Sequence, residues 1–457
     1  MEATLDNRNA TQAFSPKDYS IFEYSSYSLS EDGCVFTGDY ALIGSGNTIH
    51  FAETITVPAI ETSAPRETLQ RLLFLACGLS YYKAAAPQVI HVKGGLRDSE
   101  REFLAKLIRH GLGEFCYRND LPESLEPRIE SDRLTSPYSD SDGDECWSLE
   151  SRPLVPVGGG KDSIVTLESL KRIGARPIAF SVNKFKAIED CIDISSCDRL
   201  RATRKLDRQL PSLNKAGAYN GHVPVTAINS IIALMVADSM SFGSIVMSNE
   251  RSAEFGNLTW NGGEVNHQWS KSFAFEVLLR EQLTISTLDP DRYFSLLRPL
   301  TELAIAERFA KLPKYFTAFT SCNRLFSIDP QARQSTWCCK CPKCHFVFLI
   351  LAAFLPPEEL HSIFGTNILD SPNNRESYRE ILGLTGHKPF ECVGDYEEAA
   401  AAWRLAASQR GWRQAILIPQ LLPSLQRIPQ AAISQLLSVT PPHHIPKRFE
   451  EALHAIA

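Results

Sequence analysis

The chain has 457 residues, of which 44% are hydrophobic and 22% are charged, and its formal net charge is -6. This length exceeds that of one typical folding core, so we expect two or three domains. The composition is that of an ordinary soluble globular protein. Because nucleic-acid binding usually shows as a basic surplus on one face, the acidic balance argues against a nucleic-acid partner, although it permits a local basic patch.

The other bulk features point to a cytoplasmic enzyme. Residues 1–20 have no basic start followed by an apolar core, so no secretory signal is predicted. The longest apolar run, 346–355, is about half as long as a membrane-spanning helix needs to be, which indicates a buried helix and no membrane span. The twelve cysteines are interpreted as free thiols or metal ligands before disulfides.

The first part of the chain mixes strand-like and helical patterns. Strands are predicted at 33–44 and 47–57, and helices at 67–84 and 99–115. A stretch rich in Ser, Asp and Pro follows at 131–150 and is interpreted as a linker. We therefore expect residues 1–130 to form an N-terminal α+β domain that binds substrate.

The section after the linker alternates regularly between strands and helices. Strands are predicted at 152–157, 176–182 and 244–248, and helices at 161–174 and 225–243. Because such alternation implies a parallel sheet covered on both faces, residues 151–350 are predicted to form an α/β domain with a doubly wound parallel sheet. Residues 351–457 are predicted to be a mainly helical C-terminal region, with 396–412 as its clearest helix.

The sequence VPVGGGKDS, at 155–163, joins the first of these strands to the first helix. Glycines let the backbone approach a ligand closely, and a helix N-terminus offers unpaired N–H groups. We therefore expect an anion site of phosphate type, where Lys161 adds a charge, Ser163 a hydroxyl and Asp162 a contact to Mg²⁺. The backbone groups would come from Gly158, Gly159 and Gly160. The spacing matches neither the Walker loop nor the dinucleotide fingerprint, and the alternative is a tight turn without a ligand.

A second group of polar residues follows the strand at 244–248. In open α/β sheets, ligands bind beyond the carboxyl ends of the strands, so this group falls at the expected mouth. We predict proton transfer by His267, Lys271 and Glu250, with His267 first because the pKa of histidine lies near neutrality. The predicted substrate-binding residues around them are Ser248, Asn249, Arg251, Asn266 and Ser270. For any one of these residues, the alternative is a solvated, capped start of a helix.

Three further segments carry candidate residues. Tyr81, Tyr82 and Lys83 would bind a phosphorylated or sugar-bearing part of a substrate, unless the tyrosines are core residues and the lysine faces solvent. His222, ahead of another predicted helix, is interpreted as a helix-entry contact rather than a catalyst. The segment just before the helix at 396–412 carries His387, Lys388, Glu391 and Cys392 and could close over the site.

Five cysteines occur between residues 322 and 344. Cys322, Cys338, Cys341 and Cys344 supply four thiolates, enough for a closed tetrahedral Zn²⁺ site. Four protein ligands leave no open position for substrate, so a structural rather than a catalytic ion is predicted. The alternatives are a redox-active cysteine pair and a site that has lost its metal.

The segment GGGKDS resembles the pyrophosphate loop, Ser-Gly-Gly-x-Asp-Ser, of the ATP pyrophosphatases, which include asparagine and GMP synthetases, tRNA thiolases and cyano-deazaguanine synthases. The resemblance implies an adenine nucleotide α-hydrolase-like fold and cleavage of ATP to AMP and pyrophosphate. Gly158 replaces the usual first serine, and Lys161 could compensate. Ser181 to Asn183 fall where that superfamily binds adenine. The cysteine pattern is similar to the zinc site of the cyano-deazaguanine synthases, with Cys339 where these often have glycine.

Six motifs span most of the chain: GLSYYKA, VGGGKDS, SNERSAEFGN, VNHQWSKS, CPKCHFVFL and ECVGDYEEA. Taken together, they resemble the MurL-type UDP-N-acetyl-α-D-muramoyl-L-alanyl-L-glutamate epimerases. The resemblance implies that the enzyme inverts the terminal L-glutamate of a small-molecule UDP-sugar dipeptide in peptidoglycan precursor synthesis. It implies ATP and Mg²⁺, an acyl-adenylate, and no nucleic-acid or membrane partner.

Two other interpretations stay open. A ligase or cyano-deazaguanine-type synthase would use the same adenylation and capture the product with ammonia. The cysteine cluster favours that class, whereas the extra N-terminal domain and the long C-terminal region oppose it. A tRNA-modifying or other RNA-binding protein is opposed by the acidic balance and by the lack of a basic arm. The sequence leaves the oligomeric state open.

Overall fold

A computed structural model describes residues 14–58, 65–134, 147–326 and 336–456. Ten strands form one sheet in the order β12-β9-β6-β7-β8-β3-β2-β1-β4-β5. The strands are β1 (Tyr19–Leu29), β2 (Val35–Gly44), β3 (Thr48–Thr56), β4 (Val89–Val92), β5 (Arg128–Ser131), β6 (Leu154–Pro156), β7 (Ile178–Val182), β8 (Asp198–Lys205), β9 (Ile245–Met247) and β12 (Tyr293–Ser295). The pairings from β12 to β8, and those of β4 with β1 and β5, are parallel, whereas the pairings from β8 through β3 and β2 to β1 are antiparallel. The predicted α/β class with a large, mostly parallel sheet is confirmed.

The helices that surround the sheet come in two groups. Those of the first two thirds of the chain are α1 (Glu67–Tyr82), α2 (Asp98–Gly111), α3 (Gly113–Asn119), α4 (Lys161–Arg172), α5 (Lys186–Ser195), α6 (Leu210–Ala216), α7 (Val225–Ser239) and α8 (Phe273–Ile285). The others are α9 (Glu302–Phe309), α10 (Pro342–Ala352), α11 (Pro357–Phe364), α12 (Arg375–Ile381), α13 (Tyr396–Ser408), α14 (Leu417–Leu421) and α15 (Gln430–Leu436). A small hairpin pairs β10 (Leu258–Trp260) with β11 (Gly263–Val265).

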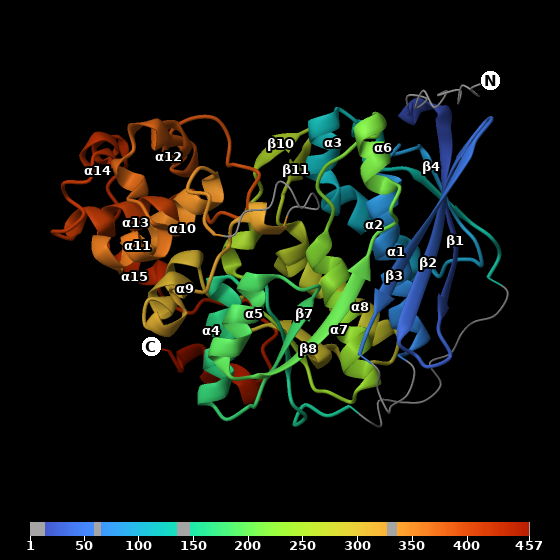
Figure 1. The fold of residues 1–457 in the computed structure, drawn as a ribbon, viewed down its shortest axis with the longest axis horizontal. Coiled ribbons are helices and arrows are strands. Elements are labelled where there is room, and N and C mark those ends of the chain that lie inside the picture. The colour runs from blue at the N-terminus through green and yellow to red at the C-terminus, as the bar shows by residue number, and fades with distance from the viewer. Residues whose placement is uncertain (1–13, 59–64, 135–146, 327–335, 457) are drawn as a thin grey trace, which may run out of the picture.

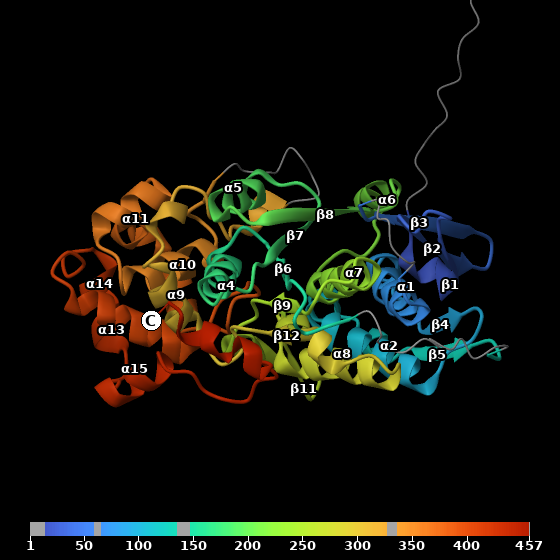
Figure 2. The same cartoon turned by 90° about the horizontal axis from the view of Figure 1, so that it is seen from below.

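The parallel part of the sheet separates two hydrophobic cores. Successive residues of a strand point to opposite faces, so Val155 of β6 packs into one core and its neighbour Leu154 into the other. The helices α4, α5 and α9 contribute to the first core, and α1, α7 and α8 to the second. Figure 2 shows α4 and α7 on opposite sides of β6 and β9. The sheet is therefore covered on both faces at this end.

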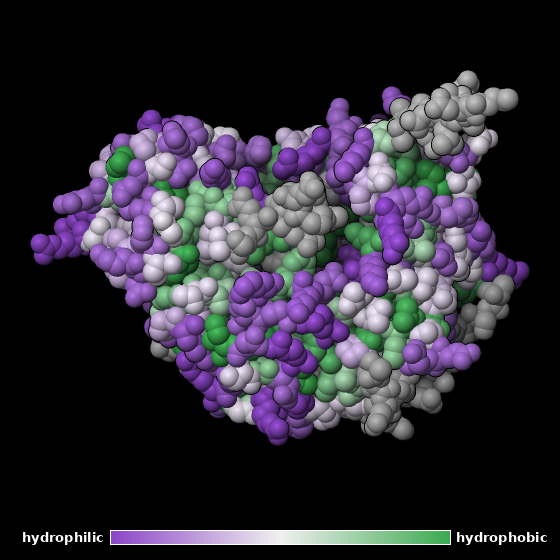
Figure 3. Space-filling view, in the orientation of Figure 1, coloured by the Kyte–Doolittle hydropathy of each residue, from purple (hydrophilic) through white to green (hydrophobic). Residues whose placement is uncertain are grey.

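The helical C-terminal part is confirmed as well. Figures 1 and 2 both show α11 to α15 at one end of the molecule and β1 to β3 at the other. The apolar run at 346–355 falls largely on α10, whose residues 346–352 are fully buried. Within the described parts of the chain, no helix has the length and apolar character needed to cross a bilayer. On the face drawn in Figure 3, hydrophobic residues are scattered among hydrophilic ones around a central hollow.

The strand β8 was not predicted, and it joins the N-terminal strands to the parallel part of the sheet. It pairs with β7 on one side and with β3 on the other. At this junction Arg204 Nε lies 2.6 Å from Glu53 Oε1, and both side chains are buried. Most of the proposed linker, 135–146, lies outside the described residues. The division into domains near residues 130 and 350 stays a prediction.

We expect the substitution Glu53→Gln to lower the free energy of unfolding by about 3–5 kcal/mol, because it leaves the buried Arg204 charge uncompensated. Urea unfolding followed by circular dichroism would measure the effect. The matched control is Arg199→Gln, also on β8, whose guanidinium is exposed and pairs with Glu189. Loss of this exposed ion pair should lower the free energy of unfolding by at most about 1 kcal/mol. Equal effects of the two substitutions would contradict the importance of the buried pair.

Candidate functional site

The glycine loop connects β6 to α4 and ends at the start of this twelve-residue helix. Gly159 has a φ of +80°, a left-handed conformation that side chains disfavour. Its carbonyl accepts a hydrogen bond from the Thr320 backbone N–H at 2.9 Å, which ties the loop to the segment before Cys322. A Cβ on Gly160 would lie 2.6 Å from Ser321 Oγ. The backbone conformation therefore favours glycine at 159, and a side chain at 160 would require Ser321 to move.

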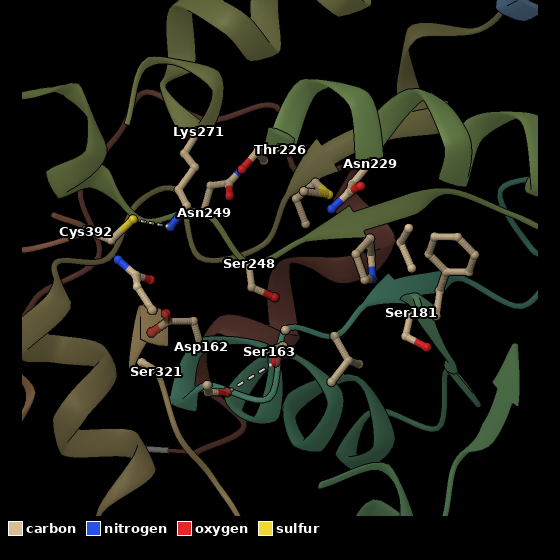
Figure 4. A pocket seen from close by; sticks show the side chains of 18 of the residues that line it. Asp162, Ser163, Ser181, Thr226, Asn229, Ser248, Asn249, Lys271, Ser321 and Cys392 are labelled. Carbon is tan, nitrogen blue, oxygen red and sulfur yellow. Dashed lines mark hydrogen bonds between the residues drawn. The ribbon is translucent and has the colours of Figure 1, made fainter. Parts of the chain in front are cut away.

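One cavity lies at the carboxyl ends of β6, β7 and β9, as expected for an open α/β sheet. The predicted residues that line it are Gly158, Gly160, Asp162, Ser163, Ser181, Ser248, Asn249 and Lys271. The lining residues that were not predicted include Thr226, Asn229, Ser321, Asn323, Lys343 and Cys392. Figure 4 shows side chains of both sets converging on the same space. The sequence thus indicated about half of the polar lining.

Lys161 does not line the cavity. Its ammonium is buried, where it donates hydrogen bonds to the carboxylates of Asp162 and Glu302. Lys343 also approaches Glu302, at 3.5 Å. Burial opposes the charge on Glu302, but these two lysines outweigh it and lower the pKa of Glu302 to about 2. Lys161 therefore holds Asp162 and Glu302 in place instead of offering its charge beside Gly158.

Other predicted residues lie around the cavity rather than in its wall. Asn183, in a left-handed conformation, accepts a hydrogen bond from the Arg204 backbone N–H at 2.9 Å and so fixes the end of β7. Glu250 is buried, and this burial raises the pKa of its carboxyl group. Asn266 donates to the Ala253 carbonyl at 2.8 Å. The remaining members of this outer group are Arg251, His267 and Ser270.

The N-terminal residues that were predicted to contact substrate are buried. Tyr81 and Tyr82 have 0% exposure and belong to the core between α1 and the sheet. The Tyr82 hydroxyl lies 3.2 Å from the Pro87 carbonyl. Lys83 is buried and hydrogen-bonds Asn220, and burial lowers its pKa to about 8. None of these three residues lines the cavity described above, and their contact with substrate stays a prediction.

A hydrogen-bonded group of ionisable side chains meets at one end of the cavity. Lys271 Nζ donates a hydrogen bond to Cys392 Sγ at 3.4 Å (Figure 4). His267 interacts electrostatically with Cys392, and its Nδ1 hydrogen-bonds the Glu114 carboxylate. His222 packs against His267 with ring centroids 4.4 Å apart. These residues come from the turn before α8, the loop before α13, α3 and the segment before α7.

Contacts within this group determine which of its side chains are charged. Burial opposes ionisation of Cys392, but Lys271 and His267 outweigh it and lower the thiol pKa to about 5. Burial likewise opposes the charge on His267, yet hydrogen bonds to Cys392 and Glu114 raise its pKa to about 9. For His222, burial and the neighbouring His267 lower the pKa to about 3. At neutral pH the group therefore contains a thiolate, an imidazolium and a neutral imidazole.

Sequence reasoning missed Glu114 entirely and gave Cys392 only a place in a closing segment. Neither has a local motif partner, because Glu114 and His267 are 153 residues apart in the chain. Ser321 and Asn323 flank Cys322, and Lys343 precedes Cys344. The cysteine motif was therefore the sequence feature that could have indicated these lining residues. The cysteine cluster thus lies directly behind part of the cavity.

The four predicted cysteine ligands come together. The sulfur atoms of Cys322, Cys338, Cys341 and Cys344 all lie within 4.8 Å of one another. Cys344 Sγ is 3.6 Å from Cys338 Sγ and 3.4 Å from Cys341 Sγ. Tetrahedral Zn–S bonds of about 2.3 Å place sulfur atoms about 3.8 Å apart, so the cluster could hold a zinc ion. Cys339 points elsewhere, with its thiol 3.4 Å from the Phe364 carbonyl.

Purified protein should contain about one zinc ion per chain, since four thiolates form a closed structural site. Plasma mass spectrometry would measure the content, and Cys344→Ser should lose it. Cys339→Ser is the matched control and should keep the metal. A strong chelator should also lower the thermal midpoint, because a structural zinc contributes to folding. Unchanged metal content in Cys344→Ser would exclude this ligand set.

Alkylation of Cys392 by iodoacetamide should be nearly independent of pH between 7 and 9. The thiolate is the nucleophile, and with a folded-state pKa of about 5 the thiol is already ionised at pH 7. An ordinary thiol would instead react faster as pH rises toward its pKa of about 8.5. Peptide mapping by mass spectrometry identifies the residue. Lys271→Met removes the neighbouring cation and should restore pH dependence; a wild-type rate that rises steeply with pH would contradict the ionised state.

Two known protein families together cover most of the chain. The MurL N-terminal domain family matches residues 13–296, and the MurL C-terminal domain family matches residues 318–436. No solved structure is significantly similar to the chain.

Curated relatives match over nearly their whole lengths. A UDP-N-acetyl-alpha-D-muramoyl-L-alanyl-L-glutamate epimerase of Salinispora tropica is 43% identical over 451 residues, covering 96% of this chain and 96% of the relative. A protein of the same name from Micromonospora sp. is 42% identical and covers 94% and 97%, respectively. Another, from Xanthomonas oryzae pv. oryzae, is 36% identical and covers 97% and 99%. Both family matches and these relatives show that the chain belongs to the MurL family.

Proposed function

We propose that the protein is an ATP-dependent epimerase that inverts the terminal L-glutamate of UDP-N-acetylmuramoyl-L-alanyl-L-glutamate during peptidoglycan precursor synthesis. The names of its relatives supply the substrate. The observation that carries the proposal is one cavity that combines a phosphate-type glycine loop with ionised acid–base groups. The enzyme would act in the cytoplasm on a small molecule, without a nucleic-acid or membrane partner.

The chemistry explains why both features are needed in one cavity. An α-proton beside an ionised carboxylate is barely acidic, because the carbanion would lie next to an existing negative charge. Pyridoxal phosphate offers no route, since the glutamate nitrogen is held in an amide. Adenylation of the α-carboxylate removes its charge and creates an electron sink beside the α-carbon. ATP is the co-substrate that supplies the adenylyl group and leaves as AMP and pyrophosphate.

Two ends of the cavity have different roles in this proposal. The backbone of the glycine loop and the hydroxyl of Ser163 would bind pyrophosphate, and Asp162 would bind Mg²⁺. Ser181, at the end of β7, would lie against adenine, and Asn183 would hold that strand end in place. An adenine nucleotide α-hydrolase-like fold, which we propose for this domain, would bind ATP in this arrangement. Zn²⁺ in the cysteine cluster would support the wall formed by Ser321 and its neighbours.

The opposite end would hold the glutamate and move its proton. Lys271 would stabilise negative charge on the substrate carboxyl group, and Ser248, Asn249, Arg251, Asn266 and Ser270 would surround the dipeptide. His267 carries a proton at neutral pH, so in the resting enzyme it suits proton donation rather than abstraction. Glu250 is the remaining candidate base, because burial raises its pKa above that of an ordinary carboxylate. Contact of Tyr81, Tyr82 and Lys83 with the phosphorylated or sugar-bearing part of the substrate stays a prediction.

The decisive assay supplies the protein with ATP, Mg²⁺ and UDP-N-acetylmuramoyl-L-Ala-L-Glu. After hydrolysis of the product, chiral analysis should detect D-glutamate, formed together with AMP and pyrophosphate. In deuterium oxide, the α-carbon should gain deuterium. Formation of neither D-glutamate nor AMP would refute the proposal, and AMP formation that depends on ammonia would favour a ligase.

Asp162→Asn provides the site-specific control in the same assay. Loss of an outer partner of a metal usually costs about 10–100-fold in activity, so loss of a direct ligand should cost at least that much. ATP–pyrophosphate exchange with the substrate present would measure it. Asp190→Asn is the matched variant, because Asp190 is a carboxylate on α5 that pairs with Lys186 outside the cavity. Equal exchange rates in the two variants would remove Asp162 from the nucleotide site.

A further inference from the structure

Cys392, His267 and Glu114 belong to one group of interacting side chains that reaches the cavity. Cys392 lines the cavity and accepts a hydrogen bond from Lys271, and the charge of His267 acts on its thiol. Nδ1 of His267 hydrogen-bonds the Glu114 carboxylate. Arg118 holds the other Glu114 oxygen at 2.6 Å. Arg118 therefore holds Glu114 in place, and Glu114 orients the His267 ring.

This order of groups is characteristic of nucleophilic catalysis. In such sites a nucleophile lies within hydrogen-bond reach of a base, and a third group orients the base. We propose that Cys392 is the nucleophile, which attacks the activated α-carboxyl group of the substrate glutamate and holds it as an enzyme-bound thioester. The inference rests on the adenylation proposed above, because a free carboxylate does not accept a thiolate.

The position of Cys392 suits attack on a group activated at the glycine loop. Figure 4 shows Ser181 at one side of the cavity and Cys392 with Lys271 at the other. Asp162 and Ser163 lie between these two sides. A nucleotide with its base near Ser181 and its phosphates on the loop would present the adenylated carboxyl group toward Cys392. The order of residues along the cavity thus matches the order of groups in an acyl-adenylate.

The charges around the sulfur favour the same role. Lys271 donates a hydrogen bond to it, and the buried ammonium of Lys343 also lines the cavity. Together with the imidazolium of His267, these cations stabilise the thiolate, although burial opposes it. A thiolate in an electropositive, partly exposed position is the typical form of a reactive cysteine. A structural cysteine would be buried among apolar side chains and would keep its proton.

The step balances in atoms and charge. The Cys392 thiolate forms a C–S bond with the carboxyl carbon, and the C–O bond to AMP breaks. His267 gives its proton to the departing AMP and becomes neutral. Hydrolysis of the thioester then consumes one water, returns the substrate carboxylate and the Cys392 thiolate, and releases two protons, one of which restores the His267 imidazolium.

The thioester would solve a problem that the resting site poses for proton abstraction. Sulfur donates electrons weakly to a carbonyl, so the α-proton of a thioester is more acidic than that of a carboxylate or an oxygen ester. Formation of the C–S bond also removes the negative charge that helps to hold the proton on His267. Neutral His267 can then take the α-proton, while Glu114 acts as its positioning residue. The same histidine serves as the acid in one step and the base in the next.

Cys392→Ser tests the proposal in an enzyme that still binds both substrates. ATP–pyrophosphate exchange should persist, whereas AMP release and deuterium uptake at the α-carbon should fall by at least about 10³-fold, as removal of a nucleophile does. Cys197→Ser, at a cysteine that does not line the cavity, is the control and should behave as wild type. AMP release at the wild-type rate without deuterium uptake would show that Cys392 only transfers protons, and would overturn the thioester.

A second readout detects the intermediate itself. Wild-type enzyme mixed with ATP, Mg²⁺ and substrate, then quenched in acid within milliseconds to seconds, should gain the mass of the substrate minus water. Peptide mapping should place the adduct on Cys392, and neutral hydroxylamine should remove it. No adduct at any time, with exchange intact, would overturn the proposal. Loss of exchange in wild-type enzyme would instead refute the underlying adenylation, so the two failures are distinguishable.

Discussion

The buried carboxylate of Glu302 holds together the segments that build the site. It lies at the start of α9 and pairs with Lys161 at the start of α4 and with Lys343 at the start of α10. A buried charge without a partner is strongly unfavourable, so these side chains depend on one another. Through them the glycine loop, the cysteine cluster and the C-terminal helices occupy fixed relative positions. Glu398 of α13 adds to the same junction by accepting a hydrogen bond from the Leu303 backbone N–H at 3.0 Å.

The same constraint explains why the reactive residues come from distant parts of the chain. The junction around Glu302 fixes α13, and with it the loop that carries Cys392. Once buried beside Lys271 and His267, the thiol loses its proton because the charge–charge interactions are strong in a medium less polar than water. The cysteine cluster contributes a separate anchor, since Ser321, Asn323 and Lys343 adjoin its ligands in sequence. Rigid support of this kind keeps the side chains that line the cavity in fixed relative positions.

Much of the fold could be predicted because its signals are local. The helices α1, α4, α7 and α13 and the strands β2, β3, β6, β7 and β9 follow from hydrophobic periodicity, glycine stops and β-branched runs. β8 escaped prediction because its sequence, DRLRATRK, is charged and reads as exposed. Its arginines are accommodated by ion pairs, and Arg204 is buried only because Glu53 comes from the neighbouring strand. Such a pairing between strands 151 residues apart leaves no trace in a local pattern.

The sequence by itself determined the chemistry that each segment offers. The spacing of the glycines, of the four cysteines and of the ordered motifs was sufficient to predict a phosphate-type loop, a metal-like cluster and the family. The comparisons confirm the family, and the four cysteines come together in the structure. Only the tertiary structure decided which groups meet and which of them carry a charge. It turned Lys161 away from the loop toward Glu302, and it placed His267 between Glu114 and Cys392, where the histidine keeps its proton and the cysteine loses its own. The physical reason is that a pKa depends on burial and on charges nearby in space, and neither of these can be obtained from the order of residues along a chain.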